Sequence, residues 1–337
     1  MKTLLSLALA ALPVLAQTCD RACLEGHLDK YVDAMLTHDP SKLPLAKDVR
    51  FTENGQQLDL GEGLWASMAG KGVYKLVVAD PEAGQVAALV SVKEEDRDPA
   101  KPAPAMVAVR LRVQRGVITE VETLLQRSAR SAEGFDKIGK PDPLYLTAVP
   151  AAERMSRAEL VRVANSYFTG MQQNDGRGEY LFADDCNRIE NGSSSTNAPT
   201  PAGQTRPDPK TATNYSGQWS CMEQFKSGLL HFVTRIRDRR YVAVDTERGI
   251  VFSFIFFDHA AGKTRHFETP DGRAVVAGPT TPWTWELAEL FKIEKGKMRR
   301  IEAIMDRAPY GMNSGWSTYA DGRTDRGRDE SKTSGKK

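Results

Sequence analysis

The chain contains one pattern twice. The segment AKDVRFTENG at residues 46–55 returns as ADDCNRIENG at residues 183–192. Other landmarks recur in the same order, among them Tyr31 in LDKYVDAM and Tyr167 in ANSYFTGM. The spacing between corresponding residues changes only where the second copy carries extra sequence. A repeat of this length predicts one fold formed twice, because each copy must build the same elements.

Each copy predicts the same order of secondary structure. An amphipathic helix comes first, because apolar residues repeat at three- and four-residue steps around Tyr31 and Tyr167. A short strand then ends in Asn-Gly, which is typical of tight turns. Hairpins follow, and their turns DPEAG and DTERG place glycine where a positive φ is needed. This order predicts an α+β fold of two tandem domains, each a curved antiparallel sheet wrapped on helices.

The domain boundaries follow from the repeat. A proline-rich stretch separates the copies, and only the second copy contains the Ser-, Thr- and Pro-rich run at residues 193–220. The polar C-terminus has no apolar period. We therefore expect a signal peptide (1–16), a first domain (17–135), a linker (136–156), a second domain (157–320) and a disordered tail (321–337).

The first residues predict export. Lys2 precedes an apolar run from Leu4 to Leu15, and small residues follow it, as in a signal peptide. The run is shorter than the roughly 20 apolar residues of a membrane span. We therefore expect a secreted or periplasmic protein.

The four cysteines are even in number, which in an oxidising compartment favours disulfides. The simplest pairing is local: Cys19 with Cys23, and Cys186 with Cys221. A zinc site is the alternative, although no histidine lies at zinc-finger spacing from either pair.

Charge and motifs argue against several classes of function. The formal net charge is +2 and 27% of residues are charged, which describes an ordinary mixed surface with no electrostatic case for nucleic acid. The sequence contains no glycine-rich nucleotide fingerprint, no G-x-S-x-G elbow and no H-E-x-x-H helix. Nucleotide-dependent, serine-hydrolase and zincin chemistries are therefore not expected, and we expect no cofactor.

These features resemble the nuclear transport factor 2-like superfamily, which includes the SnoaL-like polyketide cyclases. The chain is most similar to a secreted fungal and bacterial family of unknown function with ENG and PYGMxSGW motifs, the latter at residues 309–316 as PYGMNSGW. The resemblance implies two tandem cone-shaped domains, each with a pocket at its wide end. It also implies cofactor-free lyases, dehydratases or isomerases, or domains that only bind, so the fold alone does not define the function.

The second copy carries more ionisable groups than the first. Three of its histidines, His231, His259 and His266, have no counterpart near the same strands of the first copy. Matched positions also differ in chemistry: Phe51 corresponds to Arg188, Val109 to Glu289 and Gln126 to Asp306. We therefore expect any catalytic site to lie in the second copy.

Acid/base catalysis without a cofactor needs a proton acceptor with a pKa near neutrality and a group that holds developing charge. We expect Asp306, near the end of the last strand, to reach into an apolar domain, where burial would raise its pKa. Arg307 beside it would hold charge. The alternative is that both residues form a charged rim of the sheet.

Three further residues are candidates. His259 ends an apolar strand and can move a proton near neutral pH; the alternative is a loop histidine that donates to a carbonyl. His231 lies in a segment whose facing the pattern does not define. Tyr167 occupies the same position in the repeat as Tyr31, which favours a role in the core over catalysis. Its hydroxyl can also stabilise a developing charge.

We expect an exported, cofactor-independent enzyme of lyase, dehydratase or isomerase type that acts on a small hydroxylated or aromatic molecule. The alternative is a non-catalytic module that binds a small molecule or a glycan. The motif at residues 309–316 would either close over the pocket or fill the space between the domains. Neither hypothesis involves nucleic acid or a membrane, and homo-oligomerisation stays open.

Overall fold

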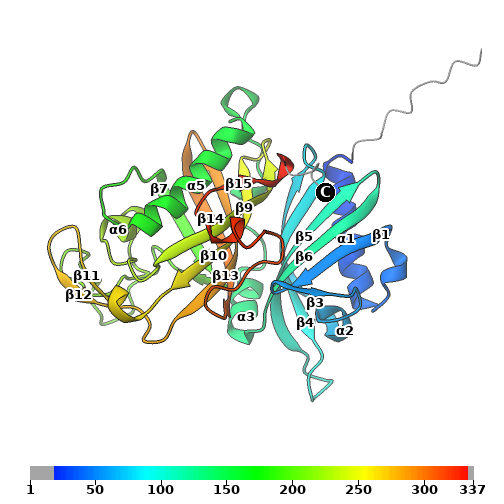
Figure 1. The fold of residues 1–337 in the computed structure, drawn as a ribbon, viewed down its shortest axis with the longest axis horizontal. Helices are drawn as coiled ribbons and strands as arrows, with labels where there is room; N and C mark the ends of the chain where they lie inside the picture. The colour runs from blue at the N-terminus through cyan, green and yellow to red at the C-terminus, as the bar shows by residue number, and fades with distance from the viewer. Residues whose placement is uncertain (1–18, 333–337) are drawn as a thin grey trace, which may run out of the picture.

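The computed structural model describes residues 19–332, so the expected signal peptide lies outside the described residues. The described chain is α+β, with two large mixed sheets and few helices. None of its helices is long and apolar enough to cross a membrane. Figure 1 shows the two sheets beside each other, with the second half in green to orange and the first in blue to cyan.

The first half begins with a helix and continues as a six-stranded sheet of order β2-β1-β6-β5-β4-β3. Its elements are α1 (Arg21–Leu36), η1 (Pro40–Lys42), β1 (Leu45–Glu53), β2 (Gln56–Leu58), α2 (Leu64–Ser67), β3 (Met68–Asp80), β4 (Gln85–Glu94), β5 (Ala103–Gln114) and β6 (Val117–Gln126). The connection to the second half contains α3 (Ala129–Ile138), α4 (Pro143–Leu146) and η2 (Ala151–Glu153).

The second half also begins with a helix, followed by a seven-stranded sheet of order β15-β9-β10-β13-β14-β7-β8 and a two-stranded sheet of β11 and β12. Its elements are α5 (Arg157–Gln173), β7 (Phe182–Glu190), β8 (Ser193–Ser194), α6 (Cys221–Lys226), β9 (Arg235–Asp245), β10 (Ile250–His259), η3 (Gly262–Arg265), β11 (His266–Glu268), β12 (Ala274–Val276), β13 (Trp283–Glu294), β14 (Lys297–Ala308), η4 (Asp321–Arg323), β15 (Arg328–Asp329) and η5 (Glu330–Lys332).

The two large sheets share a strand order. Read from opposite ends, β2-β1-β6-β5-β4-β3 corresponds to β8-β7-β14-β13-β10-β9, and β15 adds an edge strand to the second sheet. In each sheet the first long strand pairs in parallel with the last one: β1 with β6, and β7 with β14. The strands between them pair antiparallel as hairpins.

The Asn-Gly turns are confirmed, and their asparagine side chains form equivalent hydrogen bonds in both halves. Asn54 and Asn191 each have a φ of 46°, in the left-handed region that asparagine tolerates better than most residues. The Asn54 side chain bonds to both the N–H and the C=O of Leu125, at 2.7 and 3.0 Å. Asn191 bonds to Met305 in the same way, at 2.9 and 3.1 Å. Each turn is thereby fastened to the last long strand of its sheet.

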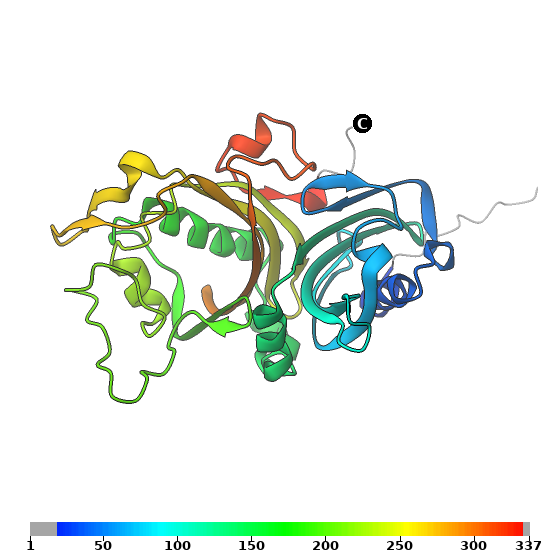
Figure 2. The same cartoon turned by 90° about the horizontal axis from the view of Figure 1, so that it is seen from below.

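Each curved sheet wraps around its own helices. Figure 2 shows α1 and α5 on opposite outer sides of the molecule, each inside the curve of its sheet. Asp20 caps α1 by accepting from the backbone N–H of Cys23, and Ser156 and Glu159 form a capping box at the start of α5. Tyr31 and Tyr167 are buried on the inner faces of these helices, within the two separate hydrophobic cores.

A third core lies between the halves, where the outer faces of the two sheets pack together (Figure 2). It contains apolar side chains from both sheets, from α3 and from the connecting segment, among them Tyr74, Leu89, Phe135, Tyr145, Phe252, Leu290 and Ile304. The sheets are therefore apolar on both faces, which is why β4, β9 and β10 are buried almost throughout their length.

Charged groups are buried in the same interface. The Arg240 guanidinium forms an ion pair with the Glu122 carboxylate of the other half, and both side chains are almost fully buried. Arg110 also binds Glu122, with 3.1 Å between Nε and Oε2. On the other side of the interface, the Tyr74 hydroxyl donates to the Glu302 carboxylate. Burying such charges is costly unless each has partners, so these contacts define one arrangement of the halves.

The expected boundaries differ from the structure at two places. The boundary at residue 135 falls inside α3, whose helical pattern we did not predict. The expected disordered tail is wrong for residues 321–332, because Arg328 and Asp329 form β15 beside β9 and Asp329 accepts from Arg157 at 2.9 Å; residues 333–337 lie outside the described residues. These polar residues are ordered by strand pairing and an ion pair, and a search for periodic apolar residues does not detect such interactions.

The motif at residues 309–316 contacts the first half through Trp316 but leaves Tyr310 46% exposed, so it bridges the halves without burying all of its aromatic groups. The Trp316 indole N–H donates to Thr52 Oγ1 of the first half at 2.8 Å. Arg50 and Arg110 lie over its ring, with 4.3 and 4.6 Å between each guanidinium carbon and the ring centroid. Such cation–π contacts hold the C-terminal segment against the first sheet.

Both predicted disulfides are present, Cys19–Cys23 and Cys186–Cys221. Among the described residues, the one group of potential metal ligands is Cys19, Cys23 and His27, and its two sulfurs are already joined to each other. Disulfides of this kind are typical of proteins in oxidising compartments.

We predict that Arg240→Met lowers the free energy of unfolding by about 3–5 kcal/mol, because it leaves buried carboxylates short of a partner. Urea unfolding measures this loss. The matched control is Arg299→Met, whose ion pair with Asp185 is solvent-exposed and should contribute about 1 kcal/mol or less. Equal losses in the two variants would contradict a special role for the buried pair.

Candidate functional site

A pocket of about 370 Å³ opens in the second half, within the size range of small-molecule sites. β10 and β13 supply its central wall, because His259 at the end of β10 pairs with Trp283 at the start of β13. Loops before β9, before β13 and before α6 complete it. The lining is mostly aromatic and apolar: Asn214, Tyr215, Leu229, Phe232, His259, Ala277, Gly278, Pro279, Trp283 and Trp285.

His259 lies in an aromatic stack at this pocket. Its ring centroid is 3.9 Å from that of Trp283, with 11° between the planes, and 5.9 Å from that of Phe232. Burial lowers the pKa of His259 to about 4, so the imidazole is neutral near pH 7. Its Nδ1 is 3.1 Å from the Phe257 carbonyl oxygen, which can only accept. Nδ1 therefore carries the proton, and Nε2 is left as an acceptor.

Arg307 and Asp306 lie on opposite faces of β14. The Arg307 guanidinium lies over the Trp283 ring, 5.0 Å from its centroid, and its charge contributes to the lowered pKa of His259. Asp306 shares its face with Glu302, which contacts the first half. Burial raises the pKa of Asp306 while the charge of Arg127 lowers it. We expected Asp306 to reach into the second domain, but strand alternation directs it toward the interface instead.

His231 is separate from this pocket. Its side chain is exposed and lies against Phe267 of β11, with 5.0 Å between the ring centroids. Of the five residues predicted for the site, the structure thus brings together His259 and Arg307, places Tyr167 deeper in the same half, and separates Asp306 and His231 from all three.

A buried polar cluster lies on the inner face of the second sheet, centred on Glu289. This carboxyl group is 1% exposed, and its Oε2 has no hydrogen-bond partner in the described part of the chain. Burial raises the pKa of Glu289 to about 8; the negative charge of Glu190 raises it further, whereas the charge of Arg188 and a hydrogen bond with Tyr167 lower it. The carboxyl group is therefore largely protonated near pH 7.

Arg188 organises the cluster from β7. Its Nη1 donates to the Tyr167 hydroxyl at 3.0 Å, and its Nη2 donates to Gln224 Oε1 at 2.6 Å. Its Nε lies 3.2 Å from a carboxylate oxygen of Glu190. The disulfide Cys186–Cys221 joins β7 to α6, the elements that carry Arg188 and Gln224. The covalent link thus helps to position both side chains.

Tyr215 lies at the pocket and senses the charges of the cluster. Its ring lines the pocket and lies 5.7 Å from that of Phe232. Tyr215 is 42% exposed. Its partial burial raises its pKa; the negative charge of Glu190 raises it further, and the positive charge of Arg188 lowers it. One side chain of the 193–220 loop therefore forms part of the aromatic wall within range of the charges of the cluster.

The first half lacks Arg188 and Glu289 at the corresponding positions, although Tyr31 and Glu53 stand where the second half has Tyr167 and Glu190. Its helix tyrosine, Tyr31, accepts from the Trp65 indole N–H at 2.9 Å instead of from an arginine. Phe51 and Val109, which match Arg188 and Glu289 in the repeat, belong to its hydrophobic core. Sequence comparison of the copies had marked both differences, but we placed neither Arg188 nor Glu289 in the predicted site. No difference between the matched segments marked Trp283 or Trp285 as a site residue.

We predict that Glu289→Gln makes stability less sensitive to alkaline pH. A carboxyl group with a raised pKa in the folded state contributes stability that is fully present below pH 4.5 and is lost as pH rises through about 8. The uncharged amide avoids this loss, so relative to the parent the variant should gain about 2–4 kcal/mol of unfolding free energy between pH 5 and pH 9.

Urea unfolding at pH 5, 7 and 9 measures the difference. The control is Glu133→Gln, a change at an exposed glutamate, which should keep a constant offset from the parent. A constant offset in Glu289→Gln as well would show that Glu289 is not protonated in the folded protein.

Comparison with solved structures found matches of low similarity. A candidate hydroxylase, AclR from Streptomyces galilaeus, is 14% identical over 40% of this chain and 92% of its own, with a TM-score of 0.26. A candidate polyketide cyclase from Silicibacter sp. tm1040 is 17% identical over 31% and 88%, with a TM-score of 0.25. A candidate isomerase from Bacillus subtilis is 12% identical over 33% and 92%, with a TM-score of 0.24.

At these values the similarity assigns no activity to the chain. A search of the curated proteins found no match. A family model, in contrast, matches residues 17–125 and 153–305, which include most of both halves. The chain therefore belongs to the family described as "Domain of unknown function (DUF8021)".

Proposed function

We propose that this chain is an exported enzyme of lyase, dehydratase or isomerase type that acts on a small hydroxylated or aromatic molecule without a cofactor. The second half carries the site, and Glu289 moves the proton. One observation carries the proposal: a carboxyl group with an unpartnered oxygen is buried beside Tyr167 and Arg188, in the same half as a small-molecule pocket.

We also propose that the halves are tandem copies of one cone-shaped domain. The shared strand order supports this proposal, as do the identical side-chain bonds of Asn54 and Asn191. In this proposal the first copy acts as a supporting partner, because its inner face is apolar where the second copy carries Arg188 and Glu289.

The proposed chemistry uses Glu289 as a general acid. Near neutral pH its carboxyl group holds a proton, which it gives to a substrate hydroxyl as the carbon–oxygen bond breaks and water leaves. The resulting carboxylate is stabilised by the charge of Arg188 and by the Tyr167 hydroxyl. The carboxylate then takes a proton from the neighbouring carbon as the double bond forms, which restores the protonated group. In the reverse direction, or in an isomerisation, the ionised carboxylate takes the proton back.

His259 has a different role in this proposal, at the aromatic wall where Arg307 lies over the Trp283 ring. Ser253 pairs with Glu289, and His259 lies six residues further along β10, about 20 Å away at ~3.3 Å per residue. His259 therefore cannot act on the bond that Glu289 protonates. We assign it to a binding contact that a small substrate makes in the pocket before it reaches Glu289, with Nε2 accepting from a substrate hydroxyl beside the Trp283 ring. Asp306 and His231 have no part in the proposed site.

A non-catalytic binding module is the second candidate. The pocket wall favours it, because stacked aromatic rings with one hydrogen-bond acceptor suit a sugar or an aromatic ligand without any chemistry. In that case Glu289 would only contribute to the stability of the second half.

We predict that the mature chain converts a component of a metabolite and oligosaccharide mixture, with a mass change such as loss of water, and that Glu289→Gln lowers turnover by at least about 100-fold. A general acid typically contributes 10²- to 10⁴-fold to the rate. Mass spectrometry before and after incubation detects the product. His259→Ala should raise KM more than it lowers kcat, because it removes a binding contact.

Asp306→Asn is the control, because this carboxylate lies on the opposite face of the sheet; its turnover should match that of the parent. Turnover lost in Asp306→Asn but kept in Glu289→Gln would reverse the assignment. An unchanged mixture, together with a molecule that co-purifies with the parent and is lost from Trp283→Ala, would establish the binding module instead.

A further inference from the structure

A second concave site lies on the opposite side of α5 from the Glu289 cluster. It is a groove of about 510 Å³ between α5, β9 and residues 325–327. We propose that this groove binds a small molecule through an oxyanion group, either a phosphate or a carboxylate. The residues that carry the argument are Arg162, Asn165, Arg239, Tyr241, Asp325 and Arg326.

Arg239 forms part of the groove and is only 1% exposed. Its Nε donates to the Ile236 carbonyl oxygen at 3.0 Å. Its other bonds go to Asn165 Oδ1, Thr169 Oγ1 and Gln172 Oε1, at 3.3, 2.9 and 3.4 Å. All of these acceptors are neutral, so no ion pair compensates the guanidinium, and the charge of Asp325 acts on it only from a greater distance.

This lack of a carboxylate distinguishes Arg239 from every other buried arginine in the described part of the chain. Arg110, Arg112, Arg157, Arg188, Arg237 and Arg240 each form an ion pair with an aspartate or glutamate. Burying a charge without an opposite charge is costly, and burial accordingly lowers the pKa of Arg239. A bound anion would supply the missing partner.

Two further cations line the groove. Arg162 on α5 and Arg326 near β15 are both exposed, and neither forms an ion pair within residues 19–332. The one acidic side chain in the lining is Asp325, which accepts from Gln172 Nε2 at 3.2 Å. Three cations therefore face one carboxylate, and three planar guanidinium groups suit the geometry of phosphate or carboxylate oxygens.

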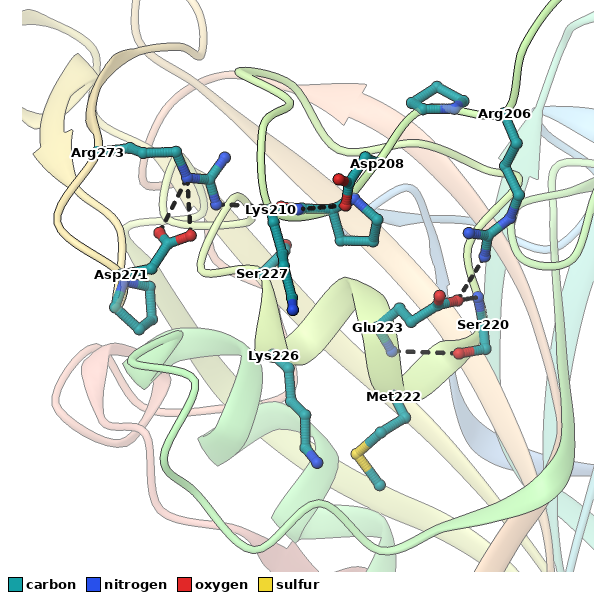
Figure 3. A pocket seen from close by; sticks show the side chains of 13 residues that line it. Arg206, Asp208, Lys210, Ser220, Met222, Glu223, Lys226, Ser227, Asp271 and Arg273 are labelled. Atoms are coloured by element: carbon teal, nitrogen blue, oxygen red, sulfur yellow. Dashed lines mark hydrogen bonds and ion pairs between the residues drawn. The ribbon is translucent and has the colours of Figure 1, made fainter.

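The larger pocket of the second half offers a contrast. It has a volume of about 770 Å³ and lies between α6, the 193–220 loop and the loop before β12. Figure 3 shows that its arginines are already paired: Arg206 with Glu223 at 2.6 Å, and Arg273 with Asp271 at 2.9 Å. Lys210 and Lys226 also line this pocket and form no ion pair within residues 19–332, but its two arginines are compensated, which makes those two arginines a suitable control for the arginines of the groove.

Arg239 also has a structural explanation, because its bonds to Asn165 and Thr169 fasten α5 to β9. The two explanations differ in what they predict for Asp325. If the groove is only a helix anchor, Asp325 has no bearing on anions. If an anion binds there, Asp325 repels it, and removing the negative charge must strengthen binding.

The test titrates the purified full chain with inorganic phosphate and, separately, with acetate at low ionic strength, where charge interactions are least screened. Isothermal calorimetry follows binding, and circular dichroism confirms folding of each variant. We expect saturable binding that is weakened about tenfold or more in Arg162→Gln/Arg326→Gln, given the strength of hydrogen bonds to charged groups. Asp325→Asn should bind more tightly than the parent, and Arg206→Gln/Arg273→Gln should bind as the parent does.

Tighter binding of phosphate than of acetate would assign a phosphate ligand, and the reverse order a carboxylate ligand. Either order supports the site if the variants behave as expected. Absence of saturable binding to both probes would overturn the proposal. So would equal weakening in the two double variants, which would indicate a general surface-charge effect, or no gain in Asp325→Asn.

Discussion

The packing of the two sheets against each other is the constraint on which the rest of the molecule depends. Each sheet already buries its inner face against a helix, so its outer face needs a second apolar surface, and the other sheet provides it. The Glu122–Arg240 pair inside this interface tolerates little displacement, because neither charge is exposed to water. The interface thereby fixes which face of every strand remains for a pocket.

That choice of face explains why the order of elements and the turns were predictable from the sequence while the proposed site was not. Asn-Gly, the hairpin glycines and the local cysteine pairs act over short distances, so their structural meaning can be read directly. A strand buried on both faces has no alternation of apolar and polar residues, and its facing is therefore hidden. Asp306 and Arg307 are neighbours in sequence, yet one lies at the interface and the other beside Trp283.

Comparison of the two matching sequence segments identified more of the proposed site than any single motif did. Arg188 and Glu289 differ from their apolar counterparts Phe51 and Val109, and the structure brings these two substituted positions together beside Tyr167. We predicted histidines as site residues because an unperturbed imidazole gains or loses its proton near neutral pH. The burial that sets the pKa values of His259 and Glu289 depends on the full three-dimensional packing, which a residue pattern does not contain.

The second half reaches its described structure only when the disulfide between Cys186 and Cys221 has formed by oxidation. It links β7 to α6 across 35 residues of sequence, and the loop that carries Tyr215 lies within that span. In a chain whose thiols stay reduced, this loop is no longer closed, and Arg188 and Gln224 lose their covalent tether. Assembly of the pocket is then coupled to oxidation, so that newly made chains in a reducing compartment would be held in a less organised form.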